Sequence, residues 1–344
     1  MSYVHGMAAI NLEMPEIVPR TEYSAEFHWP LIKHVTGMER SEEAANAFMN
    51  AWDYGFRWNI LTSSQIFGDQ RTKMGHASYE TEGSDFSGEL SQLFQDPYDV
   101  YSFDMFEAYG TKDIKQLTAE YDANYDAEIA RGVDMVPMTG IYVTCMSGLI
   151  ELMGWDTLMS AAGIDPAAFG AFVNRYSDWI LQYFQALADS KSPVVMVHDD
   201  IVWGTGPFLN PEFYRQFIFP NYKKLFRPLH EKNKKILYTS DGNFTEFIDD
   251  IAECGVNGFV LEPLTDMEYI AKKYGQTHCI VGNADTNVLL RGTKGEIETE
   301  VRRCMDIGKK CPGFFMAVGN HIPANTPVDA ALYYDDIYRN MRKR

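Results

Sequence analysis

The residues best suited to chemistry stand where short apolar runs end. In the segment 235–243, an apolar run leads into Ser240 and Asp241, and Gly242 then lets the chain turn. Buried parallel strands deliver polar side chains to one rim of a sheet in this way. Several other runs end alike, and the candidate rim residues are Glu22, Tyr23, His198, Asp199, Asp200, Ser240, Asp241, Glu262, Asn283, Asp285, Asn320 and His321.

A mixed set of oxygen and nitrogen ligands among these residues predicts a metal. Glu262 precedes Pro263, so helix capping explains it poorly, and a carboxylate beside other acids requires a cation or a proton. Asp285 could instead cap the next helix, and a lone histidine such as His321 is more often structural. Together Glu262, Asp285 and His321 suit Zn²⁺ with one position open for a substrate atom. No local motif such as H-E-x-x-H supports this trio, because its members follow three separate strands.

Aromatic and sulfur-bearing residues form a second group near the expected rims. Most such residues are ordinary core, but a subset at one rim would line an apolar pocket selective for aromatic ligands. The group comprises Met74, His76, Met135, Met138, Tyr142, Met146, Trp203, Phe208 and Met316. From both groups we assign substrate contacts to His76, Tyr142, Met146, His198, Trp203 and Asn320.

The elements that must position these residues alternate between strands and helices. Short strands are expected at 17–22, 54–63, 135–145, 193–197, 236–240, 258–261, 279–281 and 314–318. Helices are expected at 27–53, 104–131, 147–160, 166–189, 211–231, 245–254, 267–274, 295–308 and 329–342. Such alternation means a parallel sheet, and eight units with polar strand ends predict a (β/α)8 barrel whose site lies at the carboxyl rim. A doubly wound open sheet is the alternative, but no Gly-rich dinucleotide fingerprint follows the first strand.

Two features depart from the repeating unit. A helix-like piece at 3–12 precedes the first strand, and residues 64–103 lack clean periodicity. A segment this long without periodicity is usually a functional lid or excursion. We expect a single barrel domain over residues 1–344, since α/β barrels often reach this length.

Composition narrows the classes of partner and compartment. The 30 Lys and Arg against 48 Asp and Glu give a formal net charge of −18, which argues against nucleic acid and anionic membranes as partners. The five cysteines include no C-x-x-C pair, so we expect no disulfide framework and a reducing cytoplasm. The first residues show no basic region followed by an apolar core, so we expect no signal peptide. No apolar run approaches the ~20 residues of a membrane span.

Five segments together carry a family likeness: 17–22, 198–225, 238–243, 282–285 and 319–327. Through these segments the chain resembles the uroporphyrinogen decarboxylase superfamily. Because the segments are spread along the sequence, the likeness spans nearly the whole chain. The resemblance implies a (β/α)8 barrel. It is less specific about chemistry, because the superfamily contains both decarboxylases and corrinoid-dependent methyltransferases.

Departures from the family's patterns favour one branch. The decarboxylases carry an Arg-rich first motif that grips porphyrinogen carboxylates, whereas the first strand here offers only Arg20. The coenzyme M methyltransferases bind zinc through His-x-Cys after the fifth strand and Cys after the eighth, where this chain has Tyr238, Ser240 and Asn320. With these two branches disfavoured, what remains is similar to the substrate-side methyltransferases of anaerobic O-demethylase systems.

The resemblance implies that a methyl group moves from a methoxylated, often aromatic, compound to the Co(I) centre of a separate corrinoid protein. An ether oxygen is a poor leaving group, so a metal or a proton donor must stabilise it. Asp241, Asp199 or Tyr238 could supply the proton or orient the ether. The alternatives are a methylcorrinoid:acceptor methyltransferase with tetrahydrofolate or a thiol as acceptor, a lyase of the decarboxylase type, and a non-catalytic binding barrel.

Overall fold

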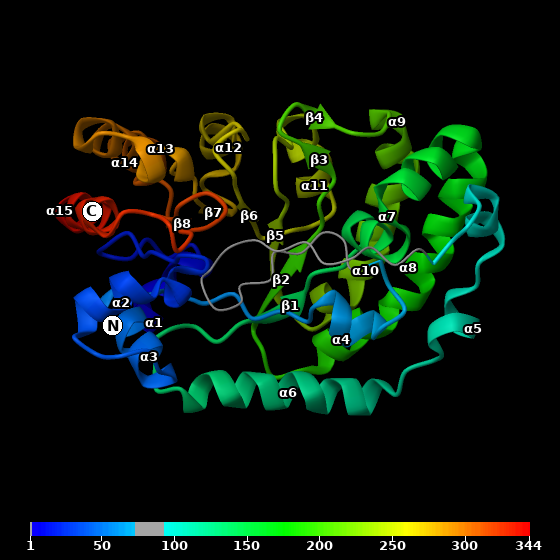
Figure 1. Cartoon of the computed structure of the whole chain (residues 1–344), viewed down its shortest axis with the longest axis horizontal. Helices are drawn as coiled ribbons and strands as arrows, with labels where there is room; N and C mark the ends of the chain where they lie inside the picture. The colour runs from blue at the N-terminus through cyan, green and yellow to red at the C-terminus, as the bar shows by residue number, and fades with distance from the viewer. Residues whose placement is uncertain (1, 73–92) are drawn as a thin grey trace.

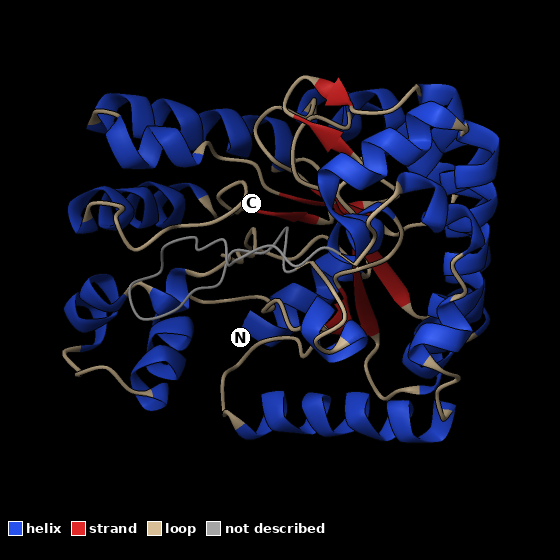
Figure 2. Ribbon diagram, turned by 45° about the vertical axis from the view of Figure 1, so that its right-hand side comes forward, coloured by secondary structure: helices blue, strands red, loops and turns tan. Residues whose placement is uncertain are grey.

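A parallel sheet stands at the centre of the chain. The computed structural model describes residues 2–72 and 93–344. Figures 1 and 2 show the strands in the middle of the molecule with helices around them. In sheet order the strands are β1 (Thr139–Ile141), β2 (Val194–His198), β5 (Lys235–Thr239), β6 (Gly258–Val260), β7 (Cys279–Val281) and β8 (Phe314–Phe315).

Single-residue bridges join the two edges of this sheet into a ring. The bridges, all parallel, pair Arg20 with Met316 and Tyr54, Phe56 with Val136, and Leu61 with Ile141. The extended segments near residues 20 and 54–61 thus stand between β8 and β1 as two further strands. The fold is a (β/α)8 barrel, which confirms the prediction from alternation.

Most of the helices follow the strands and cover the outside of the barrel. They are α1 (Ser2–Ile10), α2 (Trp29–Thr36), α3 (Glu42–Ala51), α4 (Ser63–Phe67), α5 (Met105–Tyr109), α6 (Ile114–Ala130), α7 (Met146–Ile164), α8 (Pro166–Asp189), α9 (Pro211–Phe213), α10 (Phe219–Glu231), α11 (Ile248–Glu253), α12 (Met267–Tyr274), α13 (Thr286–Arg291), α14 (Lys294–Gly308) and α15 (Val328–Met341). Short helical turns lie at η1 (Ala25–Phe27), η2 (Pro97–Ser102), η3 (Tyr214–Ile218) and η4 (Thr245–Phe247), and β3 (Val202–Trp203) pairs with β4 (Gly206–Pro207) in a hairpin.

Local chemistry explains where the helices begin. Asp165 caps α8 by accepting the N–H groups of Ala167 and Ala168, and Pro166 occupies the first turn. At α14, Thr293 and Glu296 form a reciprocal capping box. The single helix expected at 27–53 is two helices in the structure, because Gly37 ends α2 with a left-handed φ of 71°.

Alternate residues along each strand belong to two different apolar clusters. Val194 and Met196 belong to the smaller cluster, which also contains Ala9 and Ile10 of α1. Their neighbours on β2 belong to the larger cluster, together with the buried faces of the outer helices. Since side chains of a strand alternate between faces, the smaller cluster fills the barrel and α1 closes one of its ends.

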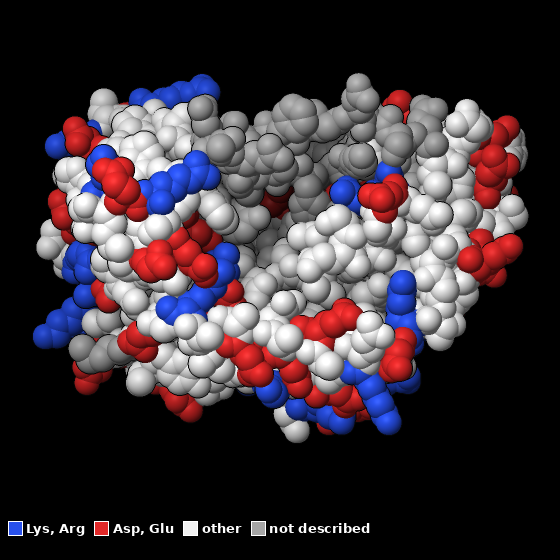
Figure 3. All heavy atoms as spheres, turned by 60° about the horizontal axis from the view of Figure 1, so that its bottom comes forward, with Lys and Arg blue, Asp and Glu red and all other residues white. Residues whose placement is uncertain are grey.

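The charged side chains lie largely on the outer surface. Figure 3 shows acidic and basic groups intermixed on one face, which is hollowed near its centre. Within the described ranges, no helix combines the length and apolar character that crossing a bilayer requires.

Candidate functional site

A histidine and two aspartates meet at the carboxyl ends of β2 and β5. Donor atoms of His198, Asp200 and Asp241 all lie within 4.8 Å of one another. Across residues 2–72 and 93–344, this is the one group of His, Cys, Asp or Glu side chains close enough to share a metal ion. His198 pairs with Thr239, so Asp241, two residues further on, projects from the same face of the sheet.

His198 is held in one orientation by Tyr142. The two rings stack with centroids 3.9 Å apart and planes inclined by 15°. Nδ1 of His198 lies 3.3 Å from the carbonyl oxygen of Tyr142, and Nε2 lies 3.3 Å from Oδ1 of Asp200. Only 4% of the surface of His198 is exposed, so the ring has little freedom to turn. Nε2 is therefore the nitrogen that faces the carboxylate.

The backbone holds Asp200 between β5 and the start of α7. Its Oδ1 accepts the backbone N–H of Asp241 at 3.0 Å. Its own N–H donates to the hydroxyl of Ser147 at 2.7 Å. Burial, together with the nearby charges of Asp200 and Asp241, raises the pKa of the Tyr142 phenol well above its ordinary value. The cluster therefore combines two carboxylates, an imidazole and a neutral phenol.

Asp199, predicted to be catalytic, lies on the opposite face of the strand. It is fully buried, and its Oδ1 accepts the N–H groups of Cys145 at 3.0 Å and Ser147 at 2.7 Å. Its Oδ2 accepts the hydroxyl proton of Tyr222 at 2.5 Å. Burial raises the pKa of Asp199 to about 6, although these hydrogen bonds oppose the shift. Asp199 thus anchors the start of α7 and lies away from the cluster.

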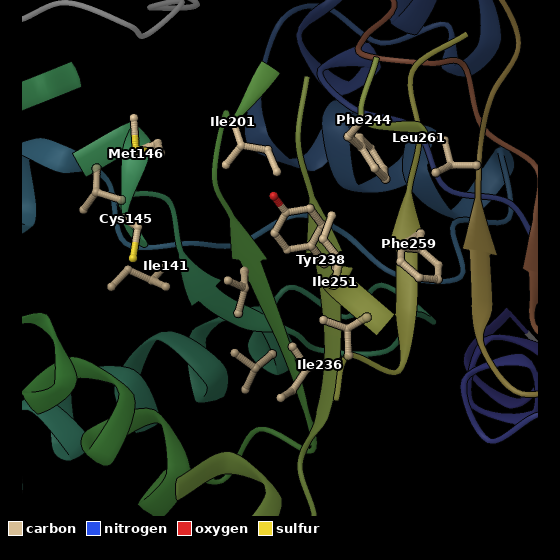
Figure 4. Packing of buried hydrophobic residues seen from close by; sticks show 14 of the residues in the cluster. Ile141, Cys145, Met146, Ile201, Ile236, Tyr238, Phe244, Ile251, Phe259 and Leu261 are labelled. Carbon is tan, nitrogen blue, oxygen red and sulfur yellow. The ribbon is translucent and has the colours of Figure 1, made fainter. Parts of the chain in front are cut away.

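Tyr238, also predicted to be catalytic, points outward for the same reason. Leu237 belongs to the cluster inside the barrel, and Tyr238 belongs to the cluster under the helices. Figure 4 shows its ring among the buried side chains there, including Ile251. Its hydroxyl donates to the carbonyl oxygen of Asp199 at 3.1 Å, and burial raises the pKa of this phenol well above its ordinary value. Tyr238 is fully buried and does not reach the carboxyl rim.

The predicted metal trio is not brought together. Asp285 caps α13 by accepting the N–H of Asn287 at 2.8 Å. Glu262 accepts the N–H of Gly242 and the side-chain amide of Asn320, each at 2.6 Å. His321 contacts the side-chain oxygen of Asn320. Glu262 thus ties together the loops that follow β5, β6 and β8, and the three residues share no common point where an ion could sit.

The predicted substrate contacts do not lie in one place. Tyr142 and His198 lie at the cluster, whereas Met146 is fully buried in the core under the helices. Trp203 is 48% exposed, and its ring lies 5.7 Å from that of Trp155. His76 falls outside the described residues, as does Met74.

The role of Asp200 was missed from sequence. The segment His198-Asp-Asp200 was recognised as a strand end, but its three residues were not separated by face. The signal that separates them is the alternation along β2, where Val194, Met196 and His198 share one face. That parity places Asp199 outside the barrel and leaves Asp200 free to turn toward Asp241.

Arg20 of the first strand is fully buried, and its guanidinium binds groups of the protein itself. Its Nε and Nη2 donate to the carbonyl oxygen of Trp52 at 3.0 and 2.7 Å, and Nη2 lies 2.8 Å from Asp335. The rings of Trp52 and Tyr338 lie within 4.4 and 4.6 Å of the guanidinium carbon. This arginine is therefore a structural group of the barrel wall.

Comparisons with known proteins agree with this fold. Residues 100–339 match the family model described as uroporphyrinogen decarboxylase (URO-D). A uroporphyrinogen decarboxylase of Geobacter metallireducens is 23% identical over 209 residues, 60% of either chain, and one of Carboxydothermus hydrogenoformans is 23% identical over 241 residues, 67% of either chain. The chain thus spans about 60% of the length of the first curated relatives it matches. A solved methyltransferase from Methanosarcina mazei shares the fold with a TM-score of 0.67 and 14% identity, over 98% of both chains.

Proposed function

Because this chain belongs to the uroporphyrinogen decarboxylase family, we propose that it is the methyltransferase of that family which opens an O-demethylation. It takes a methyl group from a methoxylated, aromatic substrate and passes it to the Co(I) centre of a separate corrinoid protein. The fold that it shares end to end with a methyltransferase of Methanosarcina mazei is consistent with this chemistry. The identity of 14% supports the architecture alone, so the choice of chemistry depends on the site.

The observation that carries the proposal is the acidic character of the cluster. His198, Asp200 and Asp241 gather at the carboxyl end of the barrel, where enzymes of this fold bind their substrates. Carboxylates there repel a substrate that bears several carboxylates of its own. They accept a neutral ether, whose departing oxygen requires a proton or a cation.

A second observation favours the methyltransferase hypothesis over the decarboxylase hypothesis. A porphyrinogen substrate needs cationic partners for its carboxylates, and bidentate arginine is suited to that task. The arginine that the first strand supplies is Arg20, which is buried and bound to Trp52 and Asp335. It has no freedom to turn toward a ligand.

The proposed transfer makes definite demands on the chain. The electron pair of Co(I) forms the new bond to the methyl carbon, and the pair of the breaking C–O bond stays on the oxygen. The resulting phenolate takes a proton, which a protonated member of the cluster can supply. Asp241 is the natural donor, since it lies on the inner face beside His198 while Asp199 and Tyr238 are sealed behind β2 and β5.

A direct assay tests the proposal. The protein is incubated with a reduced corrinoid protein and a panel of methoxyarenes, and methylcobalt is followed by its absorbance. We expect methylation of the corrinoid protein with at least one donor. We expect Asp241→Asn to slow this methylation by about a hundredfold or more. Asp266→Asn, which alters a helix cap of α12, is the matched control and should keep the wild-type rate.

The same preparation is offered uroporphyrinogen. Release of CO₂ from it, without methyl transfer from any donor, would assign the chain to the lyases and overturn the proposal. A full methylation rate in Asp241→Asn would remove the assigned proton donor.

A further inference from the structure

We infer that His198, Asp200 and Asp241 form a binding site for one divalent transition metal, with Zn²⁺ the best match to the ligands. Metal binding itself is argued from geometry, while the role of the metal rests on the proposed function. The three residues come from the ends of two neighbouring strands, β2 and β5, whose register places His198 beside Thr239.

The hydrogen bonds of His198 prepare it to bind a cation. Nδ1 faces the carbonyl oxygen of Tyr142 at 3.3 Å, and a carbonyl only accepts, so Nδ1 carries the hydrogen. In a neutral ring Nε2 then presents a lone pair. A backbone carbonyl behind the imidazole is a common outer partner of metal-bound histidines, because it fixes the tautomer and the ring.

What Nε2 faces also points to a cation. The nearest group is Oδ1 of Asp200 at 3.3 Å, and a carboxylate oxygen only accepts. The same Oδ1 already accepts the N–H of Asp241. Two opposed lone pairs in a buried place repel each other unless a proton or a metal ion lies between them.

The second carboxylate makes the cluster suited to a divalent ion. Such an ion would offset the negative charges of both Asp200 and Asp241, whose donor atoms lie within the same 4.8 Å as that of His198. One nitrogen and two carboxylate oxygens are ligands that Zn²⁺ accepts, and three protein ligands leave a position open for substrate. The ring of Tyr142, stacked on His198, and the hydrogen bond that the backbone N–H of Asp200 donates to the Ser147 hydroxyl keep the ligands in place.

Bound there, the metal would act as a Lewis acid toward the ether oxygen. With the metal bound, Asp241 would be a ligand rather than the proton donor. The metal would stabilise the oxygen that keeps the electron pair of the broken C–O bond, and water would supply its proton. This assignment replaces the trio of Glu262, Asp285 and His321.

Metal binding is tested without substrate or corrinoid. The full-length protein is stripped with a chelator and titrated with Zn²⁺ against a chromophoric competitor, and Co²⁺ is added in a parallel sample to record its visible absorption. We expect one equivalent of Zn²⁺ per chain and a Co²⁺ spectrum of low coordination number. Asp241→Asn and His198→Gln should each weaken Zn²⁺ binding by about tenfold or more.

His321→Gln and Asp285→Asn are the comparison variants, and both should bind Zn²⁺ as the wild type does. Wild-type affinity in Asp241→Asn would overturn the inference, as would loss of binding in His321→Gln or no binding by the wild type. Asp241 reaches solvent, so its variant decides the matter even if His198→Gln does not fold. Methyl transfer by a metal-free protein would leave the proposed function intact and remove the Lewis-acid role of the metal.

Discussion

Glu22 and Asp199 are carboxyl groups buried on the helix-facing side of the barrel. Glu22 accepts the hydroxyl of Tyr334 at 2.6 Å and the N–H of Val318 at 3.0 Å. Burial raises its pKa to about 7, against the opposing charge of Arg20. Burial also raises the pKa of Asp199, to about 6. Both groups thus hold a proton in the folded chain at a pH where the unfolded chain has lost it.

These two residues give stability a definite dependence on pH. A carboxyl whose pKa is raised on folding stabilises the fold below its unfolded pKa, and that contribution is lost as pH rises through the folded pKa. For Glu22 the window runs from 4.5 to about 7, and it corresponds to at most about 3 kcal/mol.

Glu22→Gln should therefore flatten the pH dependence of the free energy of unfolding. The amide loses one acceptor, so absolute stability falls at every pH, but the loss of stability between pH 5 and pH 8 becomes smaller than in the wild type by an amount of the order of 1–3 kcal/mol. Urea unfolding at several pH values measures it. Glu16→Gln, at an exposed position, should keep the wild-type slope, and an unchanged slope in Glu22→Gln would contradict the raised pKa.

At the scale of elements, the loop after β5 fixes the position of Asp241 in the site. Gly242 follows Asp241 with φ of 81°, and a Cβ added there would lie 2.8 Å from the carbonyl carbon and oxygen of Trp203. Its N–H also donates to Glu262. The position of Asp241 therefore depends on a close backbone approach that only glycine permits.

Gly242→Ala should destabilise the fold by about 1–3 kcal/mol and should weaken binding at the cluster as well. The β-carbon forces the loop away from the β3–β4 hairpin, and Asp241 moves with it. Thermal unfolding and the Zn²⁺ titration measure the two effects. Gly295→Ala lies in helix α14, where the nearest atom would be 4.0 Å away, and it should be neutral or stabilising. Equal behaviour of the two variants would contradict the close approach.

Elements were easier to predict from sequence than the directions of their side chains. The helix expected at 267–274 is α12 with the same bounds, and the break at Gly37 was missed because a glycine is also tolerated inside a helix. Asp285 could not be assigned between cap and ligand, because both uses follow a strand end. Alternation along β2 puts His198 and Asp199 on opposite faces, but which of the two faces lies inside the barrel depends on the packing of β2 against its neighbours, which is a tertiary property.

For the whole molecule, the two ends of the chain close the barrel together. Arg20 lies in the first strand, between Trp52 of α3's end and Tyr338 of α15, and it pairs with Asp335. Nearby, Ile17 bridges Lys343, and Val18 donates to the carbonyl oxygen of Arg342. The first strand is therefore held by residues more than 300 positions later.

Asp335→Ala should destabilise the chain strongly, by about 3 kcal/mol, because it leaves Arg20 charged, buried and without its carboxylate. Chemical unfolding monitored by far-UV circular dichroism measures the change. Asp336→Ala, one residue further along α15 and exposed, should change stability by less than about 0.5 kcal/mol. Similar losses in both variants would mean that α15 tolerates neither change for reasons of helix stability alone.

The exposed indole of Trp203, near the carboxyl end of the barrel, allows ligand binding to be followed by fluorescence. The backbone carbonyl oxygen of Trp203 accepts the N–H of Asn243 at 3.0 Å, and Asn243 follows Asp241 by two residues. Trp203 is 48% exposed, and its ring centroid lies 5.6 Å from that of Phe208. An aromatic substrate that settles at the cluster should remove water from this indole and shift its emission to shorter wavelength. Trp203→Phe should abolish that shift while the other tryptophans remain, and a shift that persists would mean that the ligand is reported from elsewhere.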